Sequence, residues 1–155
     1  NFEKKIIFKS KMFKPDLIEN LDIESKLAYG RLNISKKLIT AETNFDCLSN
    51  INLLDEFPVL DFSCIINSPD KKKFLKKFDV SYKKKNDPFY LDMKGSLNIL
   101  NNKISFDHIR MNNGYNATEE DLKFFKSNFE NILFDDNFLN IFDLSKIKKF
   151  VIEIS

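Results

Sequence analysis

The chain has 155 residues, enough for one domain with a hydrophobic core, and its three glycines and four prolines exclude a linker or a low-complexity segment. Its net charge is only +2, from 25 basic and 23 acidic residues, and only two of the basic residues are arginines, which argues against a nucleic-acid partner. No apolar run approaches the roughly 20 residues that a membrane-spanning helix needs. The chain begins at Asn1 rather than Met, so we expect residues 1–155 to be a single β-rich module of a longer protein.

The N-terminal part of the chain shows the period of two that is typical of strands with one polar face. Residues 4–13 predict a short strand and residues 17–34 a long one. A further alternating segment follows at residues 39–47, and we expect a hairpin turn at residues 35–38 between the two segments. The apolar phase is carried by Leu21, Ile23, Leu27, Tyr29, Ile39, Ala41, Phe45 and Cys47.

A short helix is expected near residues 70–78, after an alternating strand at residues 60–66. Ser68 is the predicted N-cap and Pro69 the predicted first helical residue. Its apolar side would consist of Phe74, Leu75 and Phe78, with lysines on the other side.

The two cysteines, Cys47 and Cys64, lack the spacing of a metal or redox motif. They could form one bridge in an oxidising compartment. We favour two small buried hydrophobic residues instead, and we therefore expect no disulfide.

The clearest alternation predicts a hairpin of residues 89–99 with residues 103–111. Asn101 and Asn102 suit a tight two-residue turn, because asparagine readily adopts positive φ. The apolar phase of the first strand is carried by Phe89, Leu91, Met93, Leu97 and Ile99.

Such a turn would place Leu97 opposite Phe106 and Ile99 opposite Ile104 on one face of the hairpin. The apolar phase shifts after Phe106, which predicts a β-bulge near Asp107.

A possible internal repeat links residues 30–40 (GRLNISKKLIT) with residues 95–105 (GSLNILNNKIS). If each copy is a hairpin, its turn falls at the same place in both. A repeated supersecondary unit is typical of arrays that are built by stacking.

The C-terminal part predicts helices. Thr118 and Asp121 resemble a capping box, and acids follow at the expected helix start. We expect a helical segment at 119–143 and a final strand or helix at 147–154. Residues 1–111 would therefore form hairpins with a short helix, and residues 117–155 a helical cap with a final strand.

No catalytic or metal-binding pattern is present in the sequence. His108 has no cysteine or second histidine at a suitable spacing, and we expect it to be a partly exposed strand residue. The acidic pairs Glu119-Glu120 and Asp135-Asp136 fit a helix start and a helix break. We expect no enzyme activity, no metal and no cofactor. The lysines of 71–77 and 83–85 predict a solvated surface first, and a contact with anionic lipid headgroups second.

The segment from SPDKKKFLKKF (68–78) through GSLNIL, NNK and ISFDHIRM (to 111) resembles the C-terminal part of AsmA-like proteins, the AsmA/TamB/YhdP superfamily of Gram-negative bacteria. The similarity is looser over residues 21–47, and the tail 117–155 departs from the family pattern, as does the lysine content.

The resemblance implies a periplasmic envelope protein that is anchored in the inner membrane by a missing N-terminal segment. It implies a curved antiparallel sheet of hairpins, mostly β with some α, that forms a hydrophobic groove. It also implies a role in phospholipid transport between the membranes and in outer-membrane maintenance, without catalytic residues. The expected partners are phospholipid acyl chains, and the predicted lipid-facing residues are Leu91, Met93, Leu97, Ile99, Ile104 and Phe106.

An alternative of another class is a self-contained α+β domain that binds a protein partner through an exposed sheet edge. A core closed by the helices and a groove left open for lipid both bury one face of every strand. The alternation alone therefore leaves both possibilities open.

Overall fold

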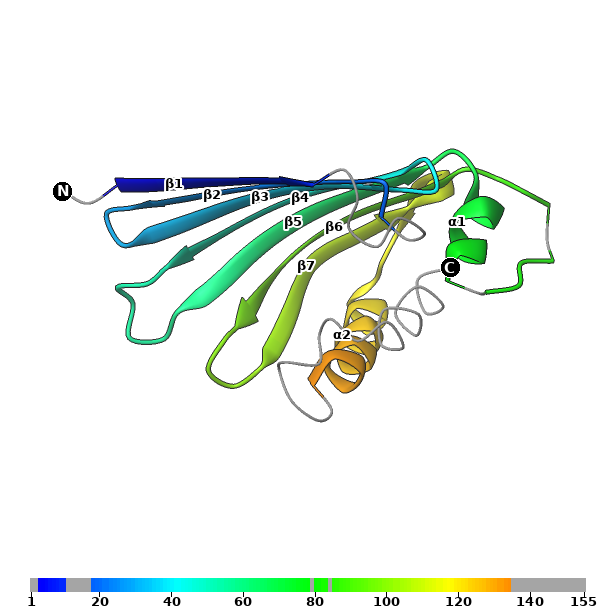
Figure 1. Cartoon of the computed structure of the whole chain (residues 1–155). Coiled ribbons are helices and arrows are strands. Elements are labelled where there is room, and N and C mark those ends of the chain that lie inside the picture. Colours follow the sequence, from blue (N-terminus) through cyan, green and yellow to red (C-terminus); the bar gives the residue numbers. More distant parts are fainter. Residues whose placement is uncertain (1–2, 11–17, 79, 84, 135–155) are drawn as a thin grey trace.

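The computed structural model describes residues 3–10, 18–78, 80–83 and 85–134, which form one open antiparallel sheet of eight strands with helices on one side (Figure 1). The strands pair in chain order, from β1 at one edge to β8 at the other. The mostly β fold with a curved sheet, a short helix and a C-terminal helix is confirmed. The expected elements at 135–143 and 147–154 lie outside the described residues.

The strands are β1 (Glu3–Ser10), β2 (Asn20–Ala28), β3 (Arg31–Thr40), β4 (Thr43–Asn52), β5 (Val59–Ser68), β6 (Phe89–Asn98), β7 (Lys103–Met111) and β8 (Tyr115–Asn116). The helices are α1 (Lys71–Lys77), the 3-10 helix η1 (Asn112–Gly114) and α2 (Glu119–Phe134).

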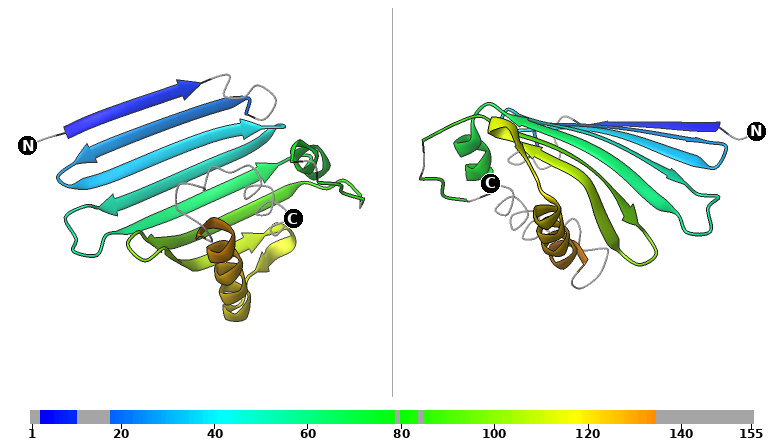
Figure 2. Two further views of the ribbon diagram at one scale, coloured as in Figure 1. Left: turned by 60° about the horizontal axis from the view of Figure 1, so that its bottom comes forward. Right: turned by 180° about the vertical axis from the view of Figure 1, so that it is seen from behind.

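The sheet has one apolar face and one polar face. The strand register places alternate residues on opposite faces. The sheet arches over the helices, so that the apolar face is concave (Figure 2). The apolar face consists of Ile6, Phe8, Leu21, Ile23, Leu27, Leu32, Ile34, Leu38, Phe45, Ile51, Leu60, Phe62, Ile66, Phe89, Leu91, Met93, Leu97, Ile104, Phe106, Ile109 and Met111, together with a few small or polar residues.

Helix α2 covers the end of the sheet formed by the later strands. The short connection through η1 and β8 turns the chain back under β7, where the Phe129 ring lies 5.1 Å from that of Phe106. Glu130 accepts a hydrogen bond from the backbone amide of Ile104 at 3.0 Å. Because this amide belongs to the edge of β7 beyond the short β8, the helix also caps a part of the sheet edge.

Helix α1 closes one end of the same face through an aromatic cluster. The Phe74 ring lies 5.8 Å from Phe45, 6.4 Å from Phe89 and 5.3 Å from Phe78. Phe74 and Leu75 are buried, so the predicted apolar side of this helix is confirmed. Within the described residues, neither helix has the length and apolar character needed to cross a membrane.

The start of α1 differs from the prediction. The N-cap is Asp70, whose side chain accepts a hydrogen bond from the Lys73 amide at 2.7 Å. Ser68 is instead the buried last residue of β5, where it accepts a hydrogen bond from the Thr43 hydroxyl at 2.7 Å. Asp and Ser are both good N-cap residues. Because β5 extends through Ser68, the helix begins later and Asp70 is its N-cap.

The predicted turn at residues 35–38 is wrong, because these residues lie in the middle of β3. The chain reverses at Tyr29-Gly30 and at Ala41-Glu42 instead. Ala41 and Glu42 both have positive φ, at 48° and 62°, without the asparagine or glycine that usually signals such a turn. The residue types at this position therefore did not predict the second turn.

The proposed repeat of hairpins is also wrong. Residues 30–40 form the end of a turn and the single strand β3, whereas residues 95–105 include a complete chain reversal. The shared letters therefore fall on different local structures.

The β6–β7 hairpin follows the prediction in its faces but not in its register. Four residues, 99–102, form the turn, and Leu97 pairs with Ile104 rather than with Phe106. Leu97 and Phe106 still lie on the same face, as predicted. The register shifts beside Gly95 so that no residue of β6 lies opposite Asp107, which confirms the predicted bulge.

The capping box at the start of α2 is confirmed. The Asp121 amide donates to the Thr118 hydroxyl oxygen at 3.3 Å, and the Thr118 amide donates to the Asp121 carboxylate at 2.9 Å. The two residues thereby satisfy each other's backbone donors at the helix start.

Candidate functional site

The apolar face is the candidate functional site because it is continuous from β1 to β7 and is covered unevenly. We call the part on β5–β7 the covered half and the part on β1–β3 the open half, with β4 between them. The helices of the described segments pack on β4–β7.

In the covered half, side chains from the sheet and from α2 form an ordinary hydrophobic core. Phe106 contacts Phe62 and Phe129 edge to face, with ring centroids 6.0 Å and 5.1 Å away. Gly95 is required here, because a Cβ at this position would lie 2.2 Å from the Ser105 carbonyl oxygen and 2.9 Å from the Phe62 ring. The buried members of this core are Ile66, Phe89, Leu91, Met93, Ile104, Phe106, Ile109 and Phe129.

The six residues predicted to face lipid divide between two environments. Four of them, Leu91, Met93, Ile104 and Phe106, are buried in the covered half. Leu97 is half-buried near the end of β6, and Ile99 lies in the β6–β7 turn and is exposed. Their contact with lipid stays a prediction, and for the four buried residues it would require α2 to move away.

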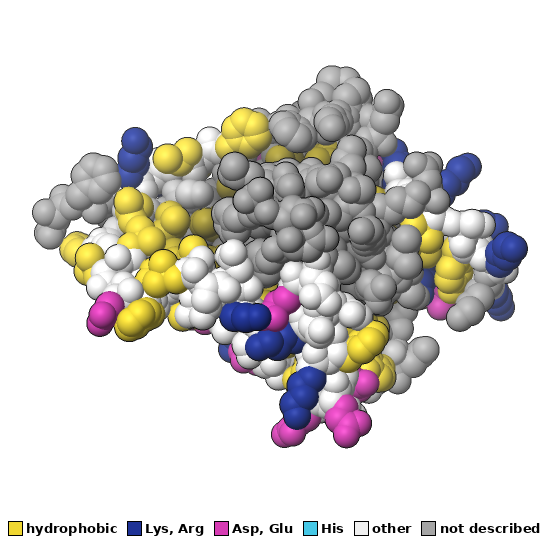
Figure 3. All heavy atoms as spheres, turned by 90° about the horizontal axis from the view of Figure 1, so that it is seen from below, with side chains coloured by type: hydrophobic (Ala, Val, Ile, Leu, Met, Phe, Trp, Pro, Cys, Tyr) yellow, Lys and Arg dark blue, Asp and Glu magenta, His cyan; other side chains and the backbone are white. Residues whose placement is uncertain are grey.

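The open half was missed as a separate region by the sequence argument. Ile6 and Phe8 are about half exposed, at 55% and 48%. Of the remaining apolar residues, Leu21 is buried at 8%, and Ile23, Leu27, Leu32, Ile34 and Leu38 are half-buried. This surface has the same apolar chemistry as the core, but none of the described helices packs on it. Figure 3 shows hydrophobic side chains toward the left of the concave side.

One cation interrupts the apolar face in the interior of the open half, and a second, Lys4, lies on the same face in the edge strand β1. Lys36 lies on the apolar face of β3, between its cross-strand neighbours Ile23 and Cys47. It is the single charged side chain that β2–β7 place on this face. Burial among these neighbours lowers the pKa of the Lys36 ammonium, although the side chain keeps an exposed surface. A cation in such a place is a suitable contact for an anionic group at the end of an apolar ligand.

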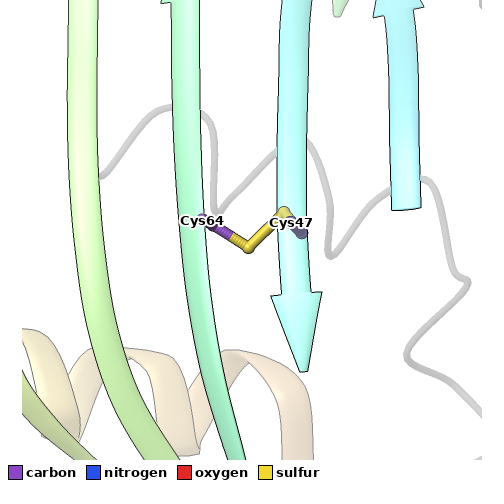
Figure 4. The surroundings of a disulfide bond; sticks show 2 residues. All are labelled: Cys47 and Cys64. Atoms are coloured by element: carbon purple, nitrogen blue, oxygen red, sulfur yellow. A yellow bond between two sulfur atoms is a disulfide. The ribbon is translucent and has the colours of Figure 1, made fainter. Parts of the chain in front are cut away.

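The expectation of free cysteines is wrong. Cys47 and Cys64 form a disulfide between β4 and β5, at the boundary between the two halves (Figure 4). They lie directly opposite each other in the ladder, with a Cα–Cα distance of 4.1 Å. The alternation placed both cysteines on apolar phases, but only the register of the two strands could bring them face to face.

The polar face offers no convergent chemistry. An open hollow of about 490 Å³ lies mainly on this side, and residues such as Glu24, Lys26, Asn33, Asp61 and Lys94 line it. The mixed charges and amides do not form a nucleophile with a base, nor an acid pair. Among the residues that the structure describes, no group of histidine, cysteine and acidic side chains could hold a metal ion.

His108 is partly exposed in β7, as expected. Its Nε2 lies 3.2 Å from an oxygen of Asp92, and Arg110 approaches the other oxygen at 3.7 Å. This is a cross-strand ion-pair group on the polar face, which is a common surface arrangement.

Comparison with known proteins found no match among models of protein families, curated proteins or solved structures. The chemical character of the candidate site therefore rests on the geometry of the sheet itself.

Proposed function

We propose that this chain is a segment of an AsmA-like envelope protein that binds phospholipid acyl chains on its apolar face during transport between the bacterial membranes. The observation that supports the proposal is the open half: an apolar strand surface, interrupted by Lys36, that the described helices leave uncovered. The periplasmic location and the inner-membrane anchor belong to the same proposal.

The open half has the size and the polarity that an acyl chain needs. Strands of nine or ten residues rise about 3.3 Å per residue, so β2 and β3 offer roughly 30 Å of apolar surface along their length. Each buried methylene contributes about 0.8 kcal/mol, so even a partly seated chain would bind. Lys36 supplies a cation beside this surface for a headgroup phosphate.

The disulfide supports the proposed compartment. Disulfides form and persist in the bacterial periplasm and are rare in the cytosol. Cys47 and Cys64 bond on the apolar face itself, where the bridge holds β4 to β5 between the covered and open halves.

A charge in the open half tests the proposal. Ile34→Asp places a carboxylate in the middle of β3 on the apolar face, whereas Asn33→Asp places it one residue away on the polar face. We expect Ile34→Asp to reduce the phospholipid that co-purifies with the chain at least fivefold, and Asn33→Asp and Ile34→Met to change it less than twofold. The measurement is native mass spectrometry of the folded proteins, with folding checked by circular dichroism. A folded Ile34→Asp variant that carries as much phospholipid as the parent would contradict the proposal.

A second candidate function is supported by the open edge of β1. In this strand Ile6, Ile7 and Phe8 are all about half exposed, and no described strand pairs with its outer edge. Such an edge can accept a strand from a protein partner. A photo-crosslinking residue at Ile7, on the polar face, would report a protein neighbour there, whereas one at Ile34 reports lipid. Protein adducts at Ile7 without lipid adducts at Ile34 would favour the interaction domain.

A further inference from the structure

Exposed apolar residues gather at one end of the sheet, on three connections that alternate along the chain with those at the other end. These are the β2–β3 turn, the β4–β5 loop and the β6–β7 turn, which all lie at the left end of the sheet in Figure 1. Leu54 is 76% exposed, Phe57 64% and Leu100 63%. We call this surface the apolar rim, and it consists of Tyr29, Leu53, Leu54, Phe57, Ile99 and Leu100.

Two of these connections contain the same asparagine turn directly before their exposed apolar residues. At the end of β4, the side-chain oxygen of Asn52 accepts a hydrogen bond from the Leu54 amide at 3.2 Å. At the end of β6, the side-chain oxygen of Asn98 accepts a hydrogen bond from the Leu100 amide at 3.1 Å. In both cases an asparagine closes a turn two residues ahead, and two exposed apolar residues follow it directly, Leu-Leu in one loop and Ile-Leu in the other.

Two of the three connections that form the rim are in contact with each other. The Leu53 amide donates to the Gly30 carbonyl oxygen at 2.8 Å, which ties the β4–β5 loop to the β2–β3 turn. A Cβ at Gly30 would lie 2.4 Å from Leu54, so glycine is what lets the leucine rest there. Tyr29 adopts a φ of 51°, which is unusual for a bulky residue and which asparagine or glycine would adopt at lower cost. The aromatic ring is therefore held in place at some conformational cost.

The charges around the rim point to an uncharged apolar partner. Arg31 and Lys103 are exposed beside it, and so are Asp55 and Glu56, so positive and negative charges balance. The lysines of α1 lie at the other end of the sheet. The apolar rim therefore has no net positive charge that would attract it to an anionic surface.

The shape of the rim and its position favour a lipid bilayer over a protein. The apolar side chains are exposed on the three connections, and none of them lines the hollow described above. A projecting apolar edge of this kind suits insertion into a lipid layer better than recognition of one protein surface. The rim also adjoins the apolar face, since Leu32, Ile51 and Leu97 lie at strand ends beside the β2–β3 turn, the β4–β5 loop and the β6–β7 turn respectively. An acyl chain could pass from a membrane to the apolar face along this edge without crossing water.

We propose that the apolar rim inserts into the interfacial layer of a zwitterionic phospholipid bilayer and that acyl chains enter the apolar face there. The entry step rests on the proposed function, whereas the docking step does not. Aromatic and leucine side chains on a charge-balanced surface suit this layer, where apolar bodies are buried and the flanking charges stay in water.

The experiment is flotation of the chain with phosphatidylcholine vesicles at low and high salt. The test variant is the double substitution Phe57→Ser and Leu100→Ser, which alters two rim residues that pack little. The matched control is Phe124→Ser with Leu48→Ser, which alters residues of similar exposure, 60% and 58%, on α2 and on the polar face. We expect the rim variant to lower the vesicle partition coefficient at least tenfold, the control less than twofold, and salt to have little effect.

The outcomes separate docking from lipid binding. If the parent does not float, if the rim variant floats like the parent, or if binding requires anionic lipid and is lost in salt, docking through the rim is wrong. Loading of phospholipid from detergent micelles, which bypasses the membrane, should be unchanged in the rim variant and reduced in Ile34→Asp. Flotation of a parent chain that takes up no lipid would leave docking in place and would overturn both the proposed function and the entry step.

Discussion

Phe8 in β1 and Phe106 in β7 occupy the same face of one sheet, and both follow from the same period-two alternation, yet their surroundings differ. Phe106 is 8% exposed and contacts aromatic rings from β5 and α2, whereas Phe8 is 48% exposed. The difference arises from where α2 lies. A helix of 16 residues is about 24 Å long, and its short connection to β7 holds it beneath the last strands. Alternation therefore specifies which residues share a face, and the segments that pack on that face decide which of them become core.

Phe106→Ala and Phe8→Ala test this comparison most strongly. Removal of the buried ring should lower the free energy of unfolding by about 3–5 kcal/mol, because it leaves a cavity between Phe62 and Phe129. Removal of the half-exposed ring should cost less than about 1 kcal/mol. Urea unfolding measures both values. Equal losses would mean that the open half is covered as well as the other half.

The disulfide at the boundary should have the next largest effect. The two cysteines are 17 residues apart, and a loop of this length predicts about 3 kcal/mol of stabilisation from the cross-link. We expect Cys47→Ala with Cys64→Ala, and the parent in reductant, to shift the urea midpoint by similar amounts. A parent with the same midpoint with and without reductant would show that the bridge does not form or does not stabilise.

Glu130 connects α2 to the edge of β7, so its substitution tests how much this contact contributes to holding α2 against the sheet. Glu130→Ala leaves the Ile104 amide without its carboxylate partner and removes the contact with Lys103 at 3.3 Å. The expected cost is about 1–3 kcal/mol, together with faster hydrogen exchange at the Ile104 amide. Glu120→Ala, in the exposed first turn of the same helix, is the control and should change neither.

The capping box should have the smallest effect, and its effect should depend on pH. Thr118→Ala should cost about 1 kcal/mol. Hydrogen bonds from the Thr118 amide, the Tyr115 hydroxyl and the Thr118 hydroxyl lower the pKa of Asp121 below its ordinary value of 3.8. A carboxyl with a lowered pKa stabilises the fold above its ordinary value, and this contribution disappears as the pH falls through the lowered value.

The difference in stability between the parent and Asp121→Asn should therefore be present at pH 7 and shrink below about pH 4. Thermal unfolding over this range measures it. A difference that stays constant down to pH 2 would contradict the assigned hydrogen bonds.

Several elements could be predicted because short-range chemistry specifies them. The capping box fixed the start of α2, the apolar pattern of 89–98 fixed the faces of β6, and the phase change after Phe106 located the bulge at Asp107. Turns were predicted less well. Ala41-Glu42 reverses the chain without a turn signal, and the Asn98 side chain lengthened the β6–β7 turn to four residues.

The sequence by itself determined that the strands of this protein would be two-faced, because alternation with a period of two encodes the side of the sheet on which each residue lies. The short segments between the predicted strands favoured antiparallel pairing, because parallel strands need a long crossover connection. Only the tertiary structure decided the rest. The pairing of β4 with β5 brought Cys47 to Cys64, and the docking of α2 buried Phe106 but not Phe8. The physical reason is that burial and cross-strand contact depend on which distant segments meet. A local pattern of apolar residues is the same whether a helix, a lipid or water lies against it.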